Sequence, residues 1–353
     1  MALAFPPADE TTDPALRTRP TQAAPSEVAV PRLSVVVVNF CQWQNTARLT
    51  RQLRHSDAVR AGEANVVIVD NGSPAEQVMK NLRGLRGVKV ELNSANLGFA
   101  AAVNRGVRVG PSEWVLLLNP DVTVEDGFLD EVLVAVDAAV KHDSATGVIG
   151  FRLLNADGTD QASAGHFPTF ASTLKGLFLP RSRRKCHHQS SQDRRQVQWV
   201  TGGCLLVRRD CFQELGGLDE RFFLYYEDVD FCRRVQQFGR TVWYDPRVAV
   251  THHWPLHKRT VPAPLRFITR HALLTFAGRH WKPWQRAALR RLVHAEARAR
   301  EGVARWRGDS VAAACYRELR LQTSRKKAHP ADVSFVAQFL RPIAAAQDTP
   351  SEP

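Results

Sequence analysis

The chain has 353 residues, 44% of them hydrophobic, and carries 48 Lys and Arg against 35 Asp and Glu, a formal charge of +13 with neutral histidines. This hydrophobic content excludes a wholly disordered chain, and the length predicts one large domain or two smaller ones. No apolar run approaches the roughly 20 residues that span a bilayer, and no signal-like segment opens the sequence. We therefore expect a cytoplasmic protein without a membrane-spanning helix.

The positive charge lies in one region. Between Lys258 and Lys327 there are 18 Lys or Arg against four Asp or Glu, a balance of +14, whereas the rest of the chain sums to −1. The first 31 residues are rich in Pro, Thr and Ala without periodicity, which is typical of a flexible tail. We therefore divide the chain into a tail at 1–31, a near-neutral domain at 32–256, a basic helical extension at 257–330 and a C-terminal tail at 331–353.

The near-neutral domain alternates apolar runs with helical stretches. The runs LSVVVVN, NVVIVDNGS, VKVELN and EWVLLLNPD predict strands, and helices are expected between them near 44–59, 75–82 and 96–107. Continuous Val, Ile and Leu are typical of parallel strands that are covered on both faces. The pattern predicts an α/β, Rossmann-like fold with a mainly parallel sheet flanked by helices, which binds its ligands beyond the carboxyl ends of the strands.

The later part of the domain adds the tight turn TGG at 201–203, the strand CLLVRR, a helix that begins near Asp228, and the strand-like run RVAVT before two histidines. Beyond it, helices rich in Ala, Leu and Arg are expected at about 264–279 and 283–307. Neither G-x-G-x-x-G nor G-x-x-x-x-G-K-[ST] follows the first strand, which argues against a dinucleotide dehydrogenase and a P-loop NTPase.

Two acidic residues follow buried strands. Asp70 can accept the imide N–H of a pyrimidine base, and it can equally cap the helix that follows. Asp121, in the sequence NPD, can hold a divalent cation that bridges a diphosphate, although the same residues are typical of an ordinary turn. Either His252 or His253 can complete a metal site with Asp121, with a structural role as the alternative.

The densest feature is the acidic and aromatic segment at 216–234. Asp228 stands at the start of the expected helix, where the helix dipole stabilises a charged general base. Capping and a helix ion pair account for Glu227 and Asp230, and they explain Asp228 less well.

In their order and spacing, these segments resemble the inverting family 2 glycosyltransferases of GT-A fold, in particular their bacterial rhamnosyltransferase-like branch. The match covers about 33–253 and rests on SVVVVNF, VDNGS, NLGFAAAVNRG, LLLNPDV, TGGCLLVRRDCF and GGLDERFFLYYEDVDFCRR. The widespread form of the family's metal motif has Asp where this chain has Asn119, so Asn119 is not expected to be a full metal ligand. The NPD form is nevertheless typical of the rhamnosyltransferase-like branch.

The resemblance implies a role for each candidate residue. Asp228 is the general base, Asp121 and His252 hold Mg²⁺ or Mn²⁺, and the sugar or acceptor is contacted by Gly202, Gly203 and Glu227. The residues implied for the nucleotide-sugar donor are Asn39, Asp70, Asn96, Gly98, Phe99, Asn104 and Asn119. The implied reaction moves a sugar, rhamnose in that branch, from a dTDP or UDP donor to a hydroxyl of a bacterial cell-surface glycan or a lipid-linked acceptor.

Elementary chemistry agrees with these roles. A single displacement needs one carboxylate to take the proton of the acceptor hydroxyl and a cation to stabilise the diphosphate that leaves. It needs no second carboxylate as nucleophile, unlike the double displacement of retaining glycosidases.

The basic extension carries Trp281, Trp284 and Trp306 among its arginines. Aromatic residues interleaved with basic ones favour an anionic membrane surface, where a lipid-linked acceptor lies, and a solvated charged face is the alternative. We therefore expect peripheral attachment to the inner face of the cytoplasmic membrane. The loop at 181–195 adds positive charge near the expected acceptor entrance.

Two other functions compete with this hypothesis. A charge of +13 suits a nucleic-acid-binding protein, but the chain has no recognisable nucleic-acid motif, so we expect no nucleic-acid partner. A sugar nucleotidyltransferase also uses a parallel sheet and a metal, but its glycine-rich pyrophosphate loop is not evident after the first strand.

Overall fold

The computed structural model describes residues 30–178, 187–188, 193–254, 261–324 and 334–348. Within them the main sheet contains ten strands: β1 (Leu33–Asn39), β2 (Ala64–Asn71), β3 (Val88–Asn93), β4 (Trp114–Leu118), β5 (Val122–Thr123), β6 (Thr146–Leu154), β7 (Asp160–Gln161), β10 (Arg195–Gln196), β12 (Cys204–Arg208) and β13 (Thr241–His252). A small second sheet pairs β11 (Trp199–Val200), β8 (Ala164–Gly165) and β9 (His187–His188).

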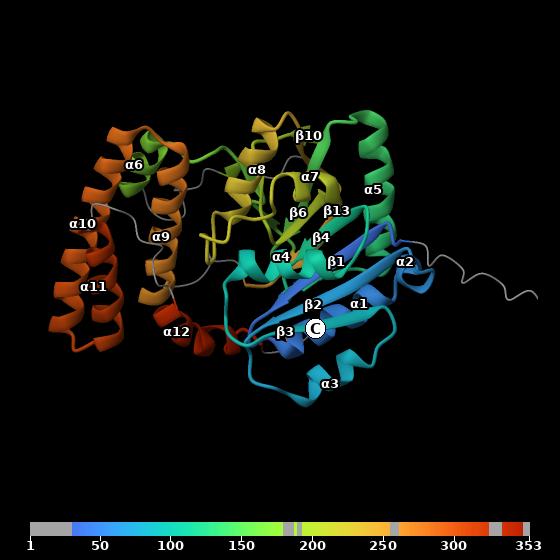
Figure 1. Ribbon diagram of the computed structural model, residues 1–353, viewed down its shortest axis with the longest axis horizontal. Helices are drawn as coiled ribbons and strands as arrows, with labels where there is room; N and C mark the ends of the chain where they lie inside the picture. The colour runs from blue at the N-terminus through green and yellow to red at the C-terminus, as the bar shows by residue number, and fades with distance from the viewer. Residues whose placement is uncertain (1–29, 179–186, 189–192, 255–260, 325–333, 349–353) are drawn as a thin grey trace, which may run out of the picture.

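The main sheet follows the order β10-β13-β6-β12-β4-β1-β2-β3 (Figure 1). The strands β4, β1, β2 and β3 run parallel, as do β6 and β13, whereas β12 is antiparallel to both of its neighbours. In the parallel part Asn39 pairs with Asp70, so the polar ends of β1 and β2 lie beside each other. This register brings the polar strand ends to one edge, as the sequence pattern predicts.

Helices cover both faces of the sheet. On one face the strands pack against α1 (Trp43–Arg54), α2 (Asp57–Arg60), α3 (Gln77–Arg83) and α5 (Phe128–His142). The other face packs against α4 (Phe99–Val109), α7 (Arg209–Glu214) and α8 (Glu227–Gln237), and α6 (Phe170–Phe178) lies further out, beside the C-terminal helices (Figure 1). Burial on both faces explains why the strands β1, β2 and β4 are almost continuously apolar.

One expected helix is divided. The stretch 44–59 forms α1 and then α2, because the chain leaves the helix after Arg54. The Asp130 carboxylate of α5 accepts the backbone N–H groups of Asp57 and Ala58, at 3.1 and 2.7 Å. A side chain from a distant element thus caps the second helix, which local periodicity does not reveal.

The C-terminal extension is a group of packed helices, α9 (Ala263–His280), α10 (Pro283–Trp306) and α11 (Ser310–Ser324) (Figure 1). It shares its core with the near-neutral domain at 32–256, since Phe267 and Phe276 of α9 belong to the same buried cluster as Phe231 of α8. Trp281 is 9% exposed and donates its indole N–H to the Pro168 carbonyl, so this tryptophan is a core residue rather than a surface one. No helix in the described segments is long and apolar enough to cross a membrane.

The segment 331–353, expected as a tail, contains an ordered element, α12 (Ser334–Ala345). Val336 and Leu340 are buried, and the Asp348 carboxylate accepts the N–H groups of Gln44 and Asn45 at 3.1 and 2.9 Å. The apolar residues of α12 are stabilised by this long-range packing, which returns the chain to the start of α1. The tail expected at 1–31 and the loop at 181–195 lie largely outside the described residues.

Candidate active site

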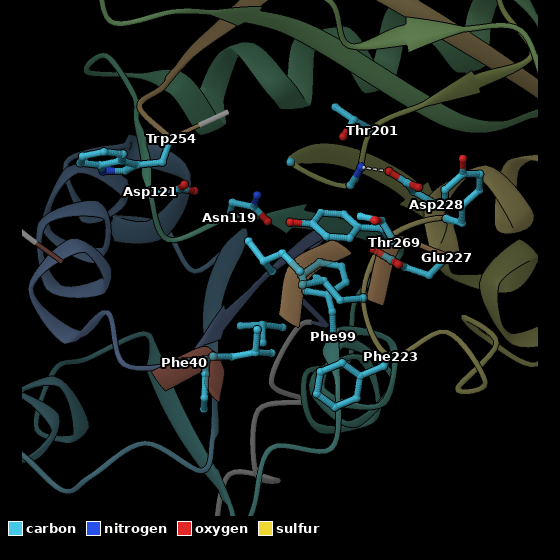
Figure 2. A pocket seen from close by; sticks show the side chains of 18 of the residues that line it. Phe40, Phe99, Asn119, Asp121, Thr201, Phe223, Glu227, Asp228, Trp254 and Thr269 are labelled. Carbon is cyan, nitrogen blue, oxygen red and sulfur yellow. Dashed lines mark hydrogen bonds between the residues drawn. The ribbon is translucent and has the colours of Figure 1, made fainter. Parts of the chain in front are cut away.

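A cavity of about 670 Å³ opens at the carboxyl ends of the parallel strands. It is lined by Asn71 at the end of β2, by Asn119 and Asp121 after β4, and by His252 at the end of β13. The start of α8 faces it from the other side with Glu227 and Asp228 (Figure 2). This is the position in which open α/β sheets bind their ligands.

Asp228 lies in the first turn of α8, where the helix dipole favours a negative charge. One carboxylate oxygen accepts the Gly202 N–H at 2.9 Å, and the other accepts the Val229 N–H at 2.8 Å (Figure 2). Burial raises the pKa of Asp228 above the ordinary value, and the two N–H donors oppose that rise. The residue is a hydrogen-bonded carboxylate with raised basicity, which is what a general base requires.

Glu227, its neighbour, has different surroundings. Its side chain is 5% exposed, and its Oε2 atom has no hydrogen-bond partner. Burial, together with the adjacent charge of Asp228, raises the pKa of Glu227 well above its usual range. A protonated Glu227 can therefore donate a hydrogen bond into the cavity beside an ionised Asp228.

Two strained residues precede these carboxyls. Tyr225 and Tyr226 both adopt positive φ angles, 71° and 69°, in a region that non-glycine residues rarely occupy. Such conformations cost of order 1–3 kcal/mol each and persist where the surroundings hold them. Both tyrosines line the cavity, and the turn that they form sets the direction in which Glu227 and Asp228 enter it. The sequence shows only a run of aromatic residues at this point.

The predicted metal residues lie together. His252 Nε2 is 3.4 Å from Asp121 Oδ1, and His252 Nδ1 contacts the side-chain amide of Gln161, with Nε2 at 2.9 Å and Oε1 at 3.2 Å. The ring of His253 instead contacts Thr123, with Nε2 2.6 Å from the hydroxyl. Of the two rings, that of His252 faces the Asp121 carboxylate, whereas His253 contacts Asp121 through its backbone N–H, which donates to the Asp121 carbonyl at 3.0 Å.

Asp121 and His252 fit a divalent cation as a partial protein site. Within the described residues no three His, Cys, Asp or Glu side chains converge as a metal-binding group. One carboxylate and one imidazole beside an open cavity suit an ion that takes its remaining ligands from a substrate diphosphate and water. The Gln161 amide fixes the ring orientation of His252, because it contacts the ring nitrogen that faces away from Asp121.

On the donor side, Asn39 and Asp70 form a buried cluster that does not line the cavity. Asn39 Nδ2 donates to Asp70 Oδ1 at 2.8 Å and to the Ser73 hydroxyl at 3.2 Å, and Asp70 Oδ2 accepts the Ser73 N–H at 3.0 Å. Asp70 is 3% exposed. In this structure the polar atoms of these two residues hold the turn after β2.

The cavity wall next to them is built by Asn71 and the 96–99 segment. Asn71 Nδ2 donates to Asn96 Oδ1 at 2.8 Å and to the Gly98 carbonyl at 3.1 Å. Gly98 has φ 90°, and a Cβ there would lie 2.7 Å from the Phe223 carbonyl oxygen, so only glycine fits. The following Phe99 donates its N–H to that same carbonyl at 2.7 Å, and its ring faces the cavity (Figure 2).

Asn104 is placed away from the cavity. Its side chain exchanges two 2.9 Å hydrogen bonds with the backbone of Leu218 and donates a third to Glu220. With its amide engaged by that loop, Asn104 supports the segment before α8 and is not among the residues that line the cavity.

The turn 201–203 lies in the cavity wall, as expected. The Gly203 carbonyl accepts the Asn119 N–H at 3.1 Å, which ties this turn to the end of β4. A Cβ at Gly202 would lie 3.8 Å from the Asp228 carboxylate, an ordinary van der Waals contact, so this turn lies directly against the candidate base.

One part of the cavity wall was not predicted from the sequence, because it comes from helices that follow the near-neutral domain in the chain. From α9 come Leu265, Arg266, Thr269 and Arg270, and from α12 and its end come Leu340, Ile343, Ala344 and Gln347. Gln42 Nε2 donates to Gln347 Oε1 at 3.2 Å across this rim. These residues belong to no recognised motif, and the basic character of the extension was the only sequence signal near them.

The glycosyl transferase family 2 domain matches residues 34–216, which include β1 to β12 and the DNGS, NPD and TGG segments. The chain belongs to glycosyl transferase family 2. This glycosyltransferase is 33% identical over 279 residues to an N-acetylglucosaminyl-diphospho-decaprenol L-rhamnosyltransferase of Mycobacterium tuberculosis, covering 73% of this chain and 88% of the relative. It is 25% identical over 153 residues to rhamnosyltransferase WbbL of Escherichia coli, covering 43% and 57%.

A solved mannosyltransferase from Pyrobaculum calidifontis, in complex with GDP-Man and Mn²⁺, aligns with 92% of this glycosyltransferase and 90% of that chain, at 17% identity and a TM-score of 0.49. The family match confirms the expected enzyme class and its rhamnosyltransferase-like resemblance. The mixed, mostly parallel sheet with flanking helices and C-terminal helices confirms the expected α/β GT-A fold of this glycosyltransferase.

Proposed function

We propose that this glycosyltransferase transfers a sugar, rhamnose, from a dTDP- or UDP-linked donor to a hydroxyl of a lipid-linked acceptor, with inversion and with Mg²⁺ or Mn²⁺. The observation that carries the proposal is the shared cavity. A carboxylate in the first turn of α8 and the Asp121–His252 pair line the same 670 Å³ space at the ends of the parallel strands. The names of the two rhamnosyltransferase relatives support the sugar, and that of the mycobacterial one supports a diphospholipid-linked acceptor.

Asp228 would act on the acceptor. The acceptor oxygen attacks the anomeric carbon, the bond from that carbon to the diphosphate oxygen breaks, and the hydroxyl proton passes to Asp228. The Gly202 and Val229 N–H groups keep the carboxylate in place before and after it takes the proton. Attack from the face opposite the leaving group inverts the anomeric configuration and requires no enzyme nucleophile.

Asp121 and His252 would hold the divalent cation beside the donor diphosphate. A cation there neutralises the charge that develops on the leaving group. Asn71, Asn96 and Phe99 would line the nucleotide site, with Asn39 and Asp70 as positioning residues beneath them. The sugar would lie near Asn119, the 202–203 backbone and the protonated Glu227.

An exposed stripe on α10 supports attachment to a membrane surface. Leu292, Val303 and Trp306 are 39%, 49% and 84% exposed and share one face of the helix, which we call the α10 ridge. The same helix also carries the exposed Arg291 and Arg298. Apolar residues flanked by basic ones suit an anionic lipid surface, where a lipid-linked acceptor is found.

The test is turnover by two variants. Asp228→Asn is expected to lower kcat roughly 10²- to 10⁴-fold with unchanged donor binding, because it removes the base and keeps the shape. Asp121→Ala is expected to lose the metal-dependent part of the donor affinity. The exposed Asp126→Asn, 88% accessible at its side chain, is the control and should behave as the wild type. Full activity in either of the first two variants would overturn its assigned role.

The donor itself is identified by thermal shift. dTDP- and UDP-linked sugars are compared with and without Mg²⁺ or Mn²⁺, since a ligand that binds only the folded state raises its stability. A donor that stabilises the wild type only with metal, and fails to do so in Asp121→Ala, meets the proposal. Equal stabilisation with and without metal would contradict the metal site.

A further inference from the structure

A second cavity of about 440 Å³ lies among α6, α9 and α10. Its walls are largely apolar and include Phe170, Leu174, Leu273, Leu289, Leu292 and Val293. In the part of the chain that the structure describes, Arg266 and Arg270 line both this cleft and the active-site cavity. The two cavities therefore meet at a pair of guanidinium groups on one face of α9.

The Arg266 side chain has a buried donor atom that can bind an anion. Its Nε atom is buried and has no hydrogen-bond partner among the residues that the structure describes. A buried, unpaired polar group costs free energy unless a ligand satisfies it, and the cost is larger for a charged group. Guanidinium groups bind phosphate oxygens in bidentate geometry, which makes phosphate the matching chemistry.

The charges next to Arg266 leave a positive surplus. Arg270 Nε donates to Glu296 Oε2 at 2.7 Å, and Arg300 Nε donates to Glu296 Oε1 at 3.0 Å. One carboxylate thus faces two guanidinium groups, and Arg266 adds a third without a carboxylate partner. Three positive charges against one negative charge leave a surplus of two at the junction, which complements a diphosphate.

The cleft continues to the α10 ridge. Leu292 belongs to that ridge, is 39% exposed, and also lines the cleft. Nearby, the 60% exposed Trp284 packs edge-on against Phe170, with ring centroids 5.3 Å apart. An apolar chain that leaves a membrane at the ridge can therefore enter the cleft without crossing a polar surface.

We infer that the cleft receives the first isoprenoid units of a polyprenyl-diphosphate acceptor, and that Arg266 and Arg270 bind its diphosphate. The order of groups in such a lipid matches the order of sites along the protein. Thr269 lines the active-site cavity near Glu227 and Asp228 (Figure 2). On the same helix, Arg266 lies about one turn before Thr269 and Arg270 follows it directly, and both arginines also line the apolar cleft. The acceptor sugar, its diphosphate and its lipid chain thus occupy the three regions in turn. The inference rests on the proposed function and names its acceptor subsite.

The first experiment measures binding without catalysis. Geranylgeranyl diphosphate is titrated into the full-length protein in EDTA, which prevents metal-dependent binding of its diphosphate at Asp121. The wild type is expected to bind it, and Arg266→Gln and Val293→Asp are each expected to weaken binding about tenfold or more. Arg266→Gln loses a charge-assisted contact with the diphosphate, and Val293→Asp loses apolar burial of the isoprenoid chain. Arg290→Gln, an exposed arginine of α10 outside the cleft, is the matched control.

The probe's two halves are then separated. Inorganic pyrophosphate should compete in the wild type and not in Arg266→Gln, and geranylgeraniol should bind more weakly than its diphosphate. Binding that neither Arg266→Gln nor Val293→Asp weakens, or that Arg290→Gln weakens equally, would overturn the inference. Thermal unfolding of each variant identifies any that fails to fold, and Val293→Thr then replaces Val293→Asp.

A second experiment distinguishes the failure of this inference from the failure of the proposed function. With glycosyl diphosphates of increasing isoprenoid length, the acceptor KM of the wild type should fall as units are added, and that of Val293→Asp should stay flat at similar kcat. A length-independent KM in the wild type would overturn the cleft while leaving glycosyl transfer intact. Diphosphate-lipid binding with the predicted variant pattern but no transfer from any nucleotide sugar would support the cleft and reject the proposed function.

Discussion

Glu227 and Asp228 are adjacent carboxyls that the fold treats differently. Asp228 receives two backbone N–H groups, which stabilise its charge, whereas Glu227 Oε2 receives none. The pair is close enough for the charge of one to raise the pKa of the other. Burial raises the pKa of both carboxyls, but the two backbone donors oppose the rise at Asp228, so Glu227 is the one that keeps a proton more readily.

The raised pKa of Glu227 predicts a pH-dependent stability. Its folded-state pKa lies above the ordinary value of 4.5, so the folded protein binds more protons than the unfolded chain. In the wild type, the contribution of Glu227 to the free energy of unfolding is fully present below about pH 4.5 and is lost as the pH rises through the pKa of the folded state. The side chain of Glu227→Gln does not titrate. The free energy of unfolding of this variant should therefore increase relative to that of the wild type as the pH rises above 4.5.

Urea unfolding between pH 5 and pH 8 measures that difference. The exposed Glu214→Gln of α7 should track the wild type throughout. A difference between Glu227→Gln and the wild type that stays constant with pH would contradict the raised pKa.

Positions in the cavity were predictable where a motif specified both residue type and place in the chain. Asp121 and Asp228 were predicted on that ground, and both line the cavity. Asp70 and Asn104 were assigned to the donor by the same reasoning, yet Asp70 bonds to the neighbouring Ser73 and Asn104 to the distant Leu218, outside the cavity lining. Whether an Asp or Asn faces a ligand or the protein depends on tertiary contacts, which residue type does not encode.

At the scale of elements, the junction of α8 and α9 joins the extension to the catalytic domain. Asp230 of α8 is fully buried and accepts from Arg234 and from His280 of α9, both at 2.7 Å. Burial alone would raise the pKa of Asp230, but the His280 hydrogen bond and the Arg234 charge lower it below the ordinary value. Asp230 is therefore an ionised anchor for α9, two residues after the candidate base.

Asp230→Asn should strongly destabilise the protein. It leaves buried cationic groups without their counter-charge, a change that costs about 3–5 kcal/mol when one partner of a buried ion pair is removed. Chemical denaturation of the full chain measures the loss, with Glu214→Gln as an exposed acidic control. A loss below about 1 kcal/mol, the range of surface ion pairs, would show that this network does not hold α9 in place.

The strands of the parallel part were predictable because burial on both faces demands continuous apolar runs. Helix bounds followed within a few residues, as in α9, expected at 264–279 and found at Ala263–His280. The break between α1 and α2 was not predictable, because the Asp130 cap comes from another element. The antiparallel placement of β12 likewise depends on which edges remain open once β4 and β6 are formed.

For the whole molecule, the local charge of +14 is partly neutralised within the extension. Arg270 and Arg300 pair with Glu296, and Arg305 and Arg320 pair with Glu301. What remains exposed includes Arg290, Arg291 and Arg298 on α10. The sequence count therefore overstated the charge available to a partner.

The ridge predicts binding to anionic vesicles. The double variant Val303→Ser, Trp306→Ser should lower the partition coefficient about tenfold, since it removes the apolar groups that enter the interface. Flotation with phosphatidylglycerol vesicles measures this, and added salt should weaken the wild type further. Val134→Ser on α5, 66% exposed in the wild type, is the control for a generic loss of surface apolar area. Equal flotation of all three proteins would contradict a membrane role for the ridge.

The cap that Asp348 places on α1 has a consequence for synthesis on the ribosome. The N–H groups of Gln44 and Asn45 receive their carboxylate from a residue more than 300 positions later. During translation the N-terminus of α1 therefore lacks this cap, and its two N–H groups face water until nearly all described segments have emerged from the ribosome. The rim of the candidate active-site cavity is thus completed last, and a nascent chain stalled within α11 should carry a folded sheet but an unfinished cavity wall.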